Sequence, residues 1–251
     1  MLIHYQDALA LCCMLVTTVH LLYLSDRNLA TVTFTLFGLT MTNADKIIEE
    51  YAEQTPSFVF IQIGAFDGIT GDPIFALAKK YLWTGILVEP QSDAFELLVA
   101  NYNNNPNISF ENIAISDTDG TKILYGVQPV EYDTSNHGQL HSFNKDVILK
   151  HAHMVKGLED RITEVSVPTM TLSSLMNKHA IKTLDLLQID TEGYDYEIIK
   201  QIDFGNSKPH FINFEHKHLS DADKSECYAL LEQNNYRLII GEYNVLAELI
   251  D

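Results

Sequence analysis

Apolar residues in this chain gather into short continuous runs. The runs at 58–63, 84–88, 184–189 and 210–214 are rich in Val, Ile, Leu and Phe, and a glycine or an acidic residue follows each of them. Runs of this length and composition are typical of strands buried on both faces of a parallel sheet. The pattern therefore predicts a sheet whose central strands have no solvent-facing side.

Segments with helical spacing separate these runs. Helices are predicted over 44–54, 74–80, 92–103, 145–155, 171–176, 194–201 and 221–233, and further strands over 108–116, 121–125 and 161–172. Asp117, Asp119 and Gly120 indicate a turn, so 121–125 is predicted to return as a hairpin. The segments 236–240 and 243–249 are predicted to pair as a closing antiparallel hairpin. Alternation of strand and helix predicts an α/β fold with a mostly parallel sheet and crossover helices.

The first 41 residues do not fit this alternation. Residues 8–24 are uncharged and largely apolar, which is about the shortest length that can span a bilayer. No Lys or Arg precedes them, so they make a poor signal peptide. Three interpretations stay open: an extra helix docked on the domain, translated sequence upstream of a true start at Met41, and a membrane anchor. The domain itself is predicted to cover 42–251, with an insertion at about 126–160.

Composition narrows the class of partner. The chain has 251 residues, 46% of them hydrophobic, which suffices for one large core. Acidic residues outnumber basic ones by 34 to 16, giving a net charge of −18. This charge argues against nucleic acid as a partner and favours a small neutral or cationic ligand. Three cysteines form neither a disulfide framework nor a zinc site. We therefore expect a cytoplasmic protein, with membrane association through 8–24 as the alternative.

A glycine-rich turn follows the first buried run. Its residues Gln62, Gly64, Ala65, Asp67 and Gly68 stand between a strand and a helix, where nucleotide-like cofactors bind at the carboxyl edge of a sheet. The spacing differs from the dinucleotide pattern G-x-G-x-x-G and from a P-loop. It suits a cofactor without pyrophosphate, such as S-adenosylmethionine, whose ammonium group a carboxylate like Asp67 can face. An ordinary turn that needs glycine only for its backbone shape is the alternative.

The next two strands also end in candidate cofactor ligands. Glu89 lies about 20 residues beyond the glycine turn, where an acidic residue on the neighbouring strand binds ribose hydroxyls. A carboxylate can accept both hydrogen bonds of a vicinal diol. Asn112, Ile113 and Ala114 follow the third strand and are predicted to line an adenine slot, with core packing as the alternative.

Acidic residues recur where two later strands end. Asp190 and Glu192 follow the run at 184–189, and Glu215 and His216 follow the run at 210–214. Because the carboxyl ends of parallel strands meet at one edge of a sheet, these side chains and Glu89 are predicted to converge. Like charges that converge cost stability unless they share a cation or a proton. The histidines of the insertion, at 137, 141, 151 and 153, lack a metal-binding pattern and are interpreted as solvated or substrate-facing.

Four motifs together resemble the FkbM-type methyltransferase family. They are the glycine turn at 62–68, Val88-Glu89-Pro90, the segment 167–172, and Ile189-Asp190-Thr191-Glu192-Gly193. The resemblance covers about residues 55–250 and implies a seven-stranded class I methyltransferase sheet with helices on both faces and S-adenosylmethionine as donor. It also implies O-methylation of a hydroxyl on a sugar, a glycolipid or a natural product. The turn departs from the family where Gln62 replaces an acidic residue.

Two mechanisms are compatible with these residues. Asp190, with Glu192 beside it, is the best-placed general base, and His216 is the alternative. Asp190, Glu215 and His216 could instead hold a divalent cation, a layout similar to that of metal-dependent methyltransferases of the catechol type. A nicotinamide-dependent oxidoreductase and a non-catalytic cofactor-binding relative are the rival functions.

Overall fold

The computed structural model describes residues 19–25, 28–34, 42–102, 105–128, 140–153 and 157–250, and the chain divides into two units, 1–42 and 43–251. In the first unit, β1 (Val19–Ser25) and β2 (Asn28–Phe34) pair as an antiparallel hairpin. Residues 19–24 therefore belong to a strand, which corrects the expectation of membrane association through a helix over 8–24, and residues 8–18 lie outside the described residues. No helix in the described part of the chain is long and apolar enough to cross a membrane. The expected start at Met41 lies outside the described residues.

A seven-stranded sheet forms the centre of the second unit, in the order β11-β12-β10-β9-β3-β4-β5. Its strands are β3 (Val59–Ile63), β4 (Thr84–Val88), β5 (Ile108–Glu111), β9 (Leu186–Ile189), β10 (Phe211–Glu215), β11 (Tyr236–Ile240) and β12 (Asn244–Leu249). Neighbours from β5 to β10 are parallel, and β12 is antiparallel to both β10 and β11. The predicted parallel sheet and closing hairpin are confirmed. Strand order reverses between β3 and β9, where ligands bind in such sheets.

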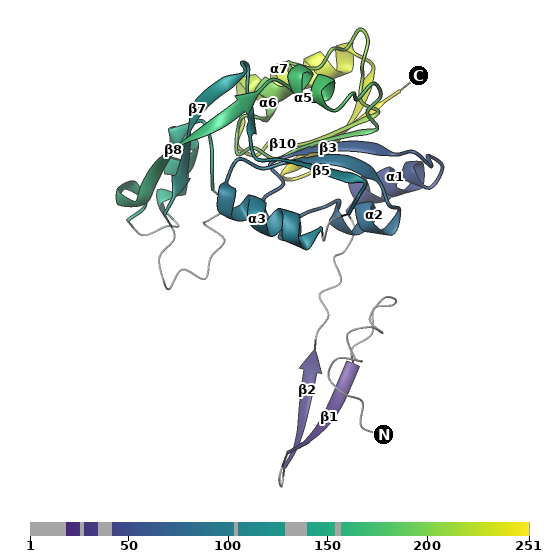
Figure 1. Ribbon diagram of the computed structural model, residues 1–251, viewed down its shortest axis with the longest axis vertical. Coiled ribbons are helices and arrows are strands. Elements are labelled where there is room, and N and C mark those ends of the chain that lie inside the picture. The colour runs from purple at the N-terminus through teal and green to yellow at the C-terminus, as the bar shows by residue number, and fades with distance from the viewer. Residues whose placement is uncertain are drawn as a thin grey trace. The chain divides into compact units, whose positions relative to one another are not determined.

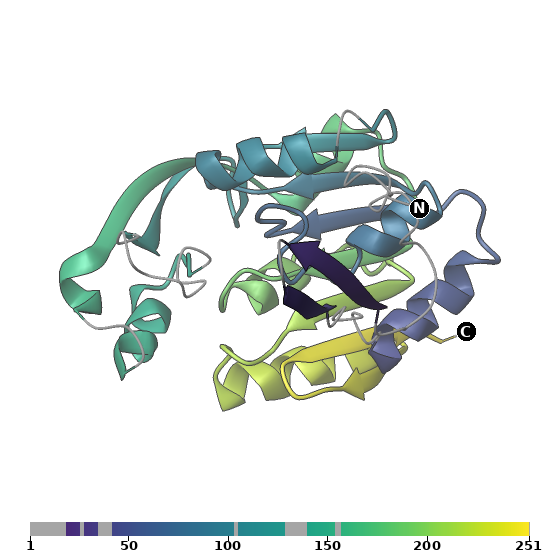
Figure 2. The ribbon, with the colours of Figure 1, turned by 90° about the horizontal axis from the view of Figure 1, so that it is seen from below.

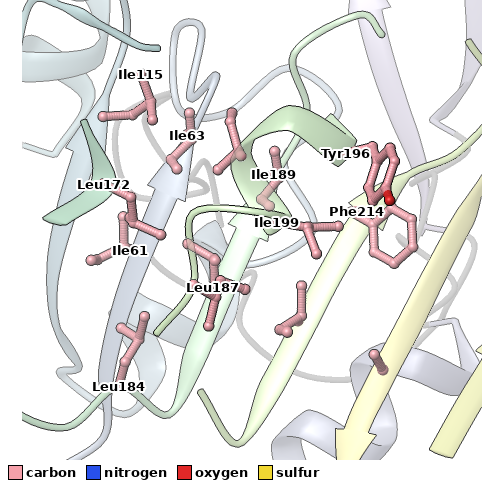
Figure 3. Close-up of a cluster of buried hydrophobic side chains, with 14 of the residues drawn as sticks. Ile61, Ile63, Ile115, Leu172, Leu184, Leu187, Ile189, Tyr196, Ile199 and Phe214 are labelled. Atoms are coloured by element: carbon pink, nitrogen blue, oxygen red, sulfur yellow. The ribbon is translucent and has the colours of Figure 1, made fainter. Parts of the chain in front are cut away.

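Helices cover both faces of this sheet (Figures 1 and 2). On one face lie α1 (Asn43–Ala52), α2 (Phe75–Lys80) and α3 (Ser92–Asn101). On the other lie α5 (Leu172–Lys178), α6 (Asp195–Ile199) and α7 (Asp221–Gln233). Figure 3 shows the larger core, where Ile61, Leu187 and Ile199 pack between the sheet and the second helical layer. Alternate strand residues such as Phe60 and Leu186 fill the opposite core, which is why these runs show no polar alternation.

A smaller sheet extends from the second unit beside the central sheet (Figure 1). It contains β6 (Ala114–Ile115), β7 (Gly120–Val127) and β8 (Ile162–Met170). Between β7 and β8 the chain forms α4 (Lys145–Leu149) and the short helices η2 (Lys150–His153) and η3 (Leu158–Arg161). We call residues 120–170 the arm. The hairpin predicted for 108–116 and 121–125 is wrong, because β8 lies between β6 and β7 and pairs with both. Asp133 and His137 lie outside the described residues.

Candidate functional site

The glycine turn brings β3 and β9 into close approach. The backbone N–H groups of Gly64 and Ala65 both donate to the carbonyl oxygen of Val88, which fixes the turn over β4. Gly64 has φ +81°, and a Cβ atom there would overlap the carbonyl oxygen of Asp190. Only glycine therefore fits between the two strand ends. Gly64, Ala65, Glu89 and Asp190 line one pocket.

Asp67, which the sequence predicts to face a cofactor ammonium, has its carboxylate bonded within the turn. One carboxylate oxygen of Asp67 accepts the backbone N–H groups of Ile69 and Thr70, and the other accepts the Thr70 hydroxyl. These bonds keep the pKa of Asp67 below its usual range against the effect of burial. Asp67 and Gly68 do not line the pocket. Gly68 instead lets the turn pack against Leu98 of α3, so both residues shape the turn.

Glu89 sits in the pocket wall where the sequence predicts it. It is 2% exposed, and its two oxygens accept the backbone N–H groups of Phe66 and Gln91 at 2.8 and 2.7 Å. Burial raises the pKa of Glu89 to about 7, although both hydrogen bonds favour its ionised form. The remaining lone pairs of this fixed carboxylate are available to hydroxyl donors in the pocket.

Of the three residues predicted to line an adenine slot, two line the pocket and one does not. Ile113 and Ala114 line the pocket next to Glu89. Asn112 is not part of this lining, because its amide donates to the carbonyl oxygen of Glu89 at 2.8 Å and its own oxygen accepts the Ser92 hydroxyl. Asn112 therefore holds the Glu89 backbone, and the apolar wall beside it comes from Ile113 and Ala114.

Asp190 follows β9 directly, and its side chain is open to the pocket. Its backbone N–H donates to the carbonyl oxygen of Ile63 at 2.9 Å, which continues the pairing of β9 with β3. Desolvation within the cleft and the charges of Asp195 and Glu192 raise the pKa of Asp190 to about 8. A carboxyl group with this pKa is a much stronger base than an ordinary aspartate.

Two side chains hold the loop that carries Asp190 and Glu192. Asp195 is fully buried and accepts the Thr191 hydroxyl at 2.7 Å and the backbone N–H of Glu215 at 3.1 Å, so it ties the ends of β9 and β10 together. From the arm, the Ser142 hydroxyl donates to the carbonyl oxygen of Glu192 at 2.7 Å. Sequence reasoning missed both residues, because their role depends on contacts between separate elements.

The predicted metal ligands do not come together as one set. Both ring nitrogens of His216 are engaged, Nδ1 with the Tyr228 hydroxyl and Nε2 with the carbonyl oxygen of Glu242. The same geometry leaves His216 outside the pocket lining, which also argues against it as the alternative base. Among the described residues, the close group is Glu192, Glu215 and His218, whose ligand atoms lie within 4.8 Å of one another.

Contacts within this group are close. His218 Nε2 lies 3.0 Å from Glu192 and 3.5 Å from Glu215. Burial, followed by the charges of Asp190 and Glu192, raises the pKa of Glu215 to about 9, so Glu215 is mainly protonated at neutral pH. A protonated carboxyl group is a weak ligand for a divalent cation. The spacing of Glu215 and His218 is the sequence signal that could have suggested the pair.

The pocket also contains residues that the sequence analysis did not assign to cofactor binding or catalysis, among them His141, which it interpreted as solvated or substrate-facing. Gln188 and Asp72 line it from the side of β9 and of the loop before α2. His141 and Phe143 line it from the arm, together with Tyr194 from the loop after β9. The Phe143 and Tyr194 rings meet edge to face, with centroids 5.1 Å apart. The pocket therefore joins an acid-lined floor at the strand ends to an aromatic wall.

Comparison with known proteins identifies a related family. A model of the methyltransferase FkbM domain matches residues 62–238. Among solved structures, the methyltransferase FkbM from Methylobacillus flagellatus KT has 12% identity and a TM-score of 0.47, and the match covers 77% of this chain and 44% of that one. A precorrin-6y C5,15-methyltransferase from Geobacter metallireducens GS-15 has 10% identity and a TM-score of 0.41, with 85% and 92% covered. This chain therefore spans less than half of the first structure, and no curated protein matches it.

Proposed function

The chain belongs to the FkbM methyltransferase family, an S-adenosylmethionine-dependent family, and from this premise we propose that it methylates a hydroxyl group with Asp190 as the general base. S-adenosylmethionine supplies a methyl group on a positively charged sulfur, so the S–CH₃ bond breaks as the O–CH₃ bond forms and the hydroxyl proton leaves. The observation that carries the proposal is Asp190, a carboxyl group with a pKa of about 8 that opens into the pocket.

Asp190 has the properties that this proton transfer needs. It follows β9, next to the glycine turn of β3, so a hydroxyl group above the turn would lie within its reach. Its raised pKa makes the ionised form a good acceptor for a proton near neutral pH. A positive charge bound in the pocket lowers this pKa again, so donor binding itself favours the ionised base.

The donor side of the pocket fits a nucleoside. Glu89 offers a fixed carboxylate for two ribose hydroxyls, and Ile113 and Ala114 offer an apolar wall for adenine. Gly64 lines the pocket and allows its backbone to lie directly against that of Asp190, so the turn and the end of β9 form one side of the site. These three features support the choice of donor independently of the comparison with known proteins.

The acceptor in this proposal is a small molecule or a glycan with a free hydroxyl group, carried by a sugar, a glycolipid or a natural product. The aromatic wall of Phe143 and Tyr194 supports an acceptor with an apolar or sugar-like face. The net charge of −18 disfavours a nucleic acid.

Binding and turnover test the proposal separately. We expect calorimetry to detect S-adenosylhomocysteine but not NAD, and radiolabelled methyl transfer to appear in a screen of glycan and lipid-linked sugar acceptors. In Asp190→Asn, turnover should fall by about 10²–10⁴-fold while affinity for S-adenosylhomocysteine is retained. Normal methylation by this variant would disprove the assignment of the base. Methylation confined to amine or carbon acceptors would disprove O-methylation.

A further inference from the structure

Lys122 on β7 of the arm donates hydrogen bonds to three side chains. Its ammonium group reaches Ser116 Oγ and one carboxylate oxygen of Asp117, each at 2.9 Å, and the Tyr194 hydroxyl at 3.2 Å. Ser116 is fully buried, and its hydroxyl donates to Asp117 at 2.8 Å. Burial alone would lower the pKa of Lys122, but its hydrogen bonds to Asp117 and Tyr194 raise it, so Lys122 is charged at neutral pH. All three N–H groups of the ammonium therefore have an acceptor.

The same ammonium group also contacts two aromatic rings. Lys122 Nζ lies 5.1 Å from the centroid of the Phe143 ring and 5.0 Å from that of the Tyr194 ring. A cation at this distance from an aromatic ring is attracted by its electrons. Phe143 packs in addition against the buried Ala114 and Leu124. Lys122 therefore joins the arm to the loop after β9 and keeps the aromatic wall of Phe143 and Tyr194 in place.

The bond from Lys122 decides what the Tyr194 hydroxyl can do. An ammonium group only donates, so the Tyr194 oxygen must accept from it. As far as the structure describes the chain, this is the one hydrogen bond of that hydroxyl, so its own proton is available to a ligand. Tyr194 lines the pocket, whereas Lys122 does not. Tyr194 can therefore donate a hydrogen bond that the neighbouring positive charge strengthens.

Tyr194 comes from a different part of the chain than the residues proposed for the methyl donor. Gln62, Glu89 and Ile113 line the pocket from β3 and from the ends of β4 and β5. Tyr194 follows Asp190 in the loop after β9, and both line the pocket. This loop therefore offers two polar contacts to one acceptor molecule, one that takes a proton and one that donates a hydrogen bond.

We propose that Tyr194 selects the acceptor by donating a hydrogen bond to a second oxygen atom of it, and that Lys122 is the residue that positions Tyr194. This inference rests on the proposed function, because it assumes that Asp190 takes the proton of the hydroxyl group that is methylated. It narrows the acceptor to a molecule with an oxygen next to the reacting hydroxyl, as in the vicinal hydroxyl groups of a pyranose. Such a ring also has C–H faces that can pack against Phe143.

Methyl glycosides and cyclohexanol provide the test. The methyl glycosides of glucose, galactose, mannose and rhamnose have vicinal oxygens, whereas cyclohexanol has a six-membered ring and one hydroxyl group. With the full chain and radiolabelled S-adenosylmethionine, kcat/KM for the best glycoside should exceed that for cyclohexanol by about 10-fold or more. Tyr194→Phe should lower kcat/KM for this glycoside by about 3–10-fold, mainly through KM, which is the range for one hydrogen bond. Its affinity for S-adenosylhomocysteine should match that of wild type.

A double-mutant cycle separates positioning from a purely structural role of Lys122. Lys122→Met should lower kcat/KM for the glycoside by about 3–10-fold in wild type. In the Tyr194→Phe background the same change should cost no more than about twofold, because the hydroxyl that Lys122 holds is already absent. Losses of equal size in the two backgrounds would overturn the positioning role.

Tyr125→Phe and Lys145→Met are the matched controls. Lys145 Nζ lies 5.7 Å from the centroid of the Tyr125 ring, so the two form a similar pair within the arm, but neither lines the pocket. Both variants should methylate the glycoside as wild type does.

Three results would overturn the inference. They are a wild-type kcat/KM for cyclohexanol that equals or exceeds that for the glycosides, full activity of Tyr194→Phe on the glycoside, and methylation of none of these compounds by a chain that binds S-adenosylhomocysteine. If wild type does not bind S-adenosylhomocysteine, the proposed function itself fails.

Discussion

At the scale of single residues, the site is a group of carboxyl groups that lie close together at the ends of β9 and β10. Burial is the largest cause of the raised pKa of Asp190, Glu215 and Asp195, and each of the first two is raised further by its neighbours. Proteins usually avoid such convergence, because like charges in a cleft destabilise the fold. A bound cation relieves this repulsion, and a donor with a sulfonium and an ammonium group brings two positive charges. Relief of the repulsion between these carboxyl groups therefore contributes to the affinity for a positively charged ligand.

Sequence reasoning found the residues of this group that follow strands and missed those fixed by contacts. Asp190 and Glu89 could be predicted because a strand end sets where a side chain lies. Asp72 and Gln188 could not, since their importance comes from hydrogen bonds to Gln62 and Asn213 on other elements. The hydrogen bonds of Asp67 are local instead, because its carboxylate accepts N–H groups of its own turn, and the sequence analysis did not consider them.

The pH dependence of turnover follows from Asp190. Its ionised form is the base, and its pKa in the free protein is raised to about 8. We therefore expect kcat/KM for the methyl donor, which reports the free enzyme, to rise with pH from about 6 and to level off above an apparent pKa near 8. A pH profile in buffers of constant ionic strength measures this. A flat profile, or one that falls over this range, would contradict the role of Asp190.

Removal of metal ions tests the group formed by Glu192, Glu215 and His218. Because the pKa of Glu215 is raised to about 9, this carboxyl group is mainly protonated near neutral pH and is then a weak ligand for a divalent cation. We expect turnover to be unchanged after dialysis against EDTA. Loss of activity that Mg²⁺ or Mn²⁺ restores would show instead that a cation takes part.

At the scale of elements, the buried strands and the closing hairpin were predictable because each is specified by its own apolar run. The arm was not, because β6 has only two residues and β8 pairs with strands on both sides. Pairings between segments about 50 residues apart leave no local signal in the sequence. The arm nevertheless matters to the site, since Ser142 bonds the loop of Glu192 and Phe143 lines the pocket.

Gly64→Ala tests the close approach of β3 and β9. The new Cβ would overlap a backbone oxygen that no side-chain rotation can move, and φ would stay at a strained +81°. We expect loss of S-adenosylhomocysteine binding and a lower unfolding free energy by more than the roughly 1–3 kcal/mol of backbone strain alone. Calorimetry and chemical denaturation measure the two effects.

Gly157→Ala is the control for that strain. Gly157 has φ +69°, and a Cβ there would meet no atom within 4 Å. Gly157→Ala should lower the unfolding free energy only by the roughly 1–3 kcal/mol of backbone strain and should leave ligand affinity unchanged. If the two variants lose the same stability and both bind ligand normally, the contact between Gly64 and Asp190 is unimportant.

At the scale of the whole molecule, one topological feature organises both stability and function. The strand order reverses between β3 and β9, so Gly64, Glu89 and Asp190 reach the same edge from different parts of the chain. Alternation of strand and helix predicted the mostly parallel sheet with crossover helices, and the structure supplies the order of its strands. The class I methyltransferase sheet thus fixes where the acidic residues gather, and the loops decide how each one is held.

The gathering of acids at that edge should be visible in the stability of the whole domain. Asp190 has an ordinary pKa of about 3.9 in the unfolded chain and about 8 in the folded protein, so between these values the folded state binds more protons. The contribution of Asp190 to the unfolding free energy must then fall as pH rises through this window. Asp190→Asn removes the effect, so its Tm relative to wild type should increase from pH 4 to pH 8 and stay constant above. Each kcal/mol corresponds to about 2–4 °C in a domain of this size.

Asp119→Asn should show the opposite behaviour. Hydrogen bonds from Thr171 and Ser174 hold the pKa of Asp119 below its usual range, so the ionised carboxylate stabilises the fold at neutral pH and this contribution is lost as pH falls through the folded-state pKa. The Tm of this variant should lie below wild type at pH 7 and approach it in acid. Thermal unfolding of both variants from pH 4 to 9 measures the two trends together. A Tm difference for Asp190→Asn that does not change with pH would mean that Asp190 is ionised in the free protein, which would also remove the basis for its role as a tuned base.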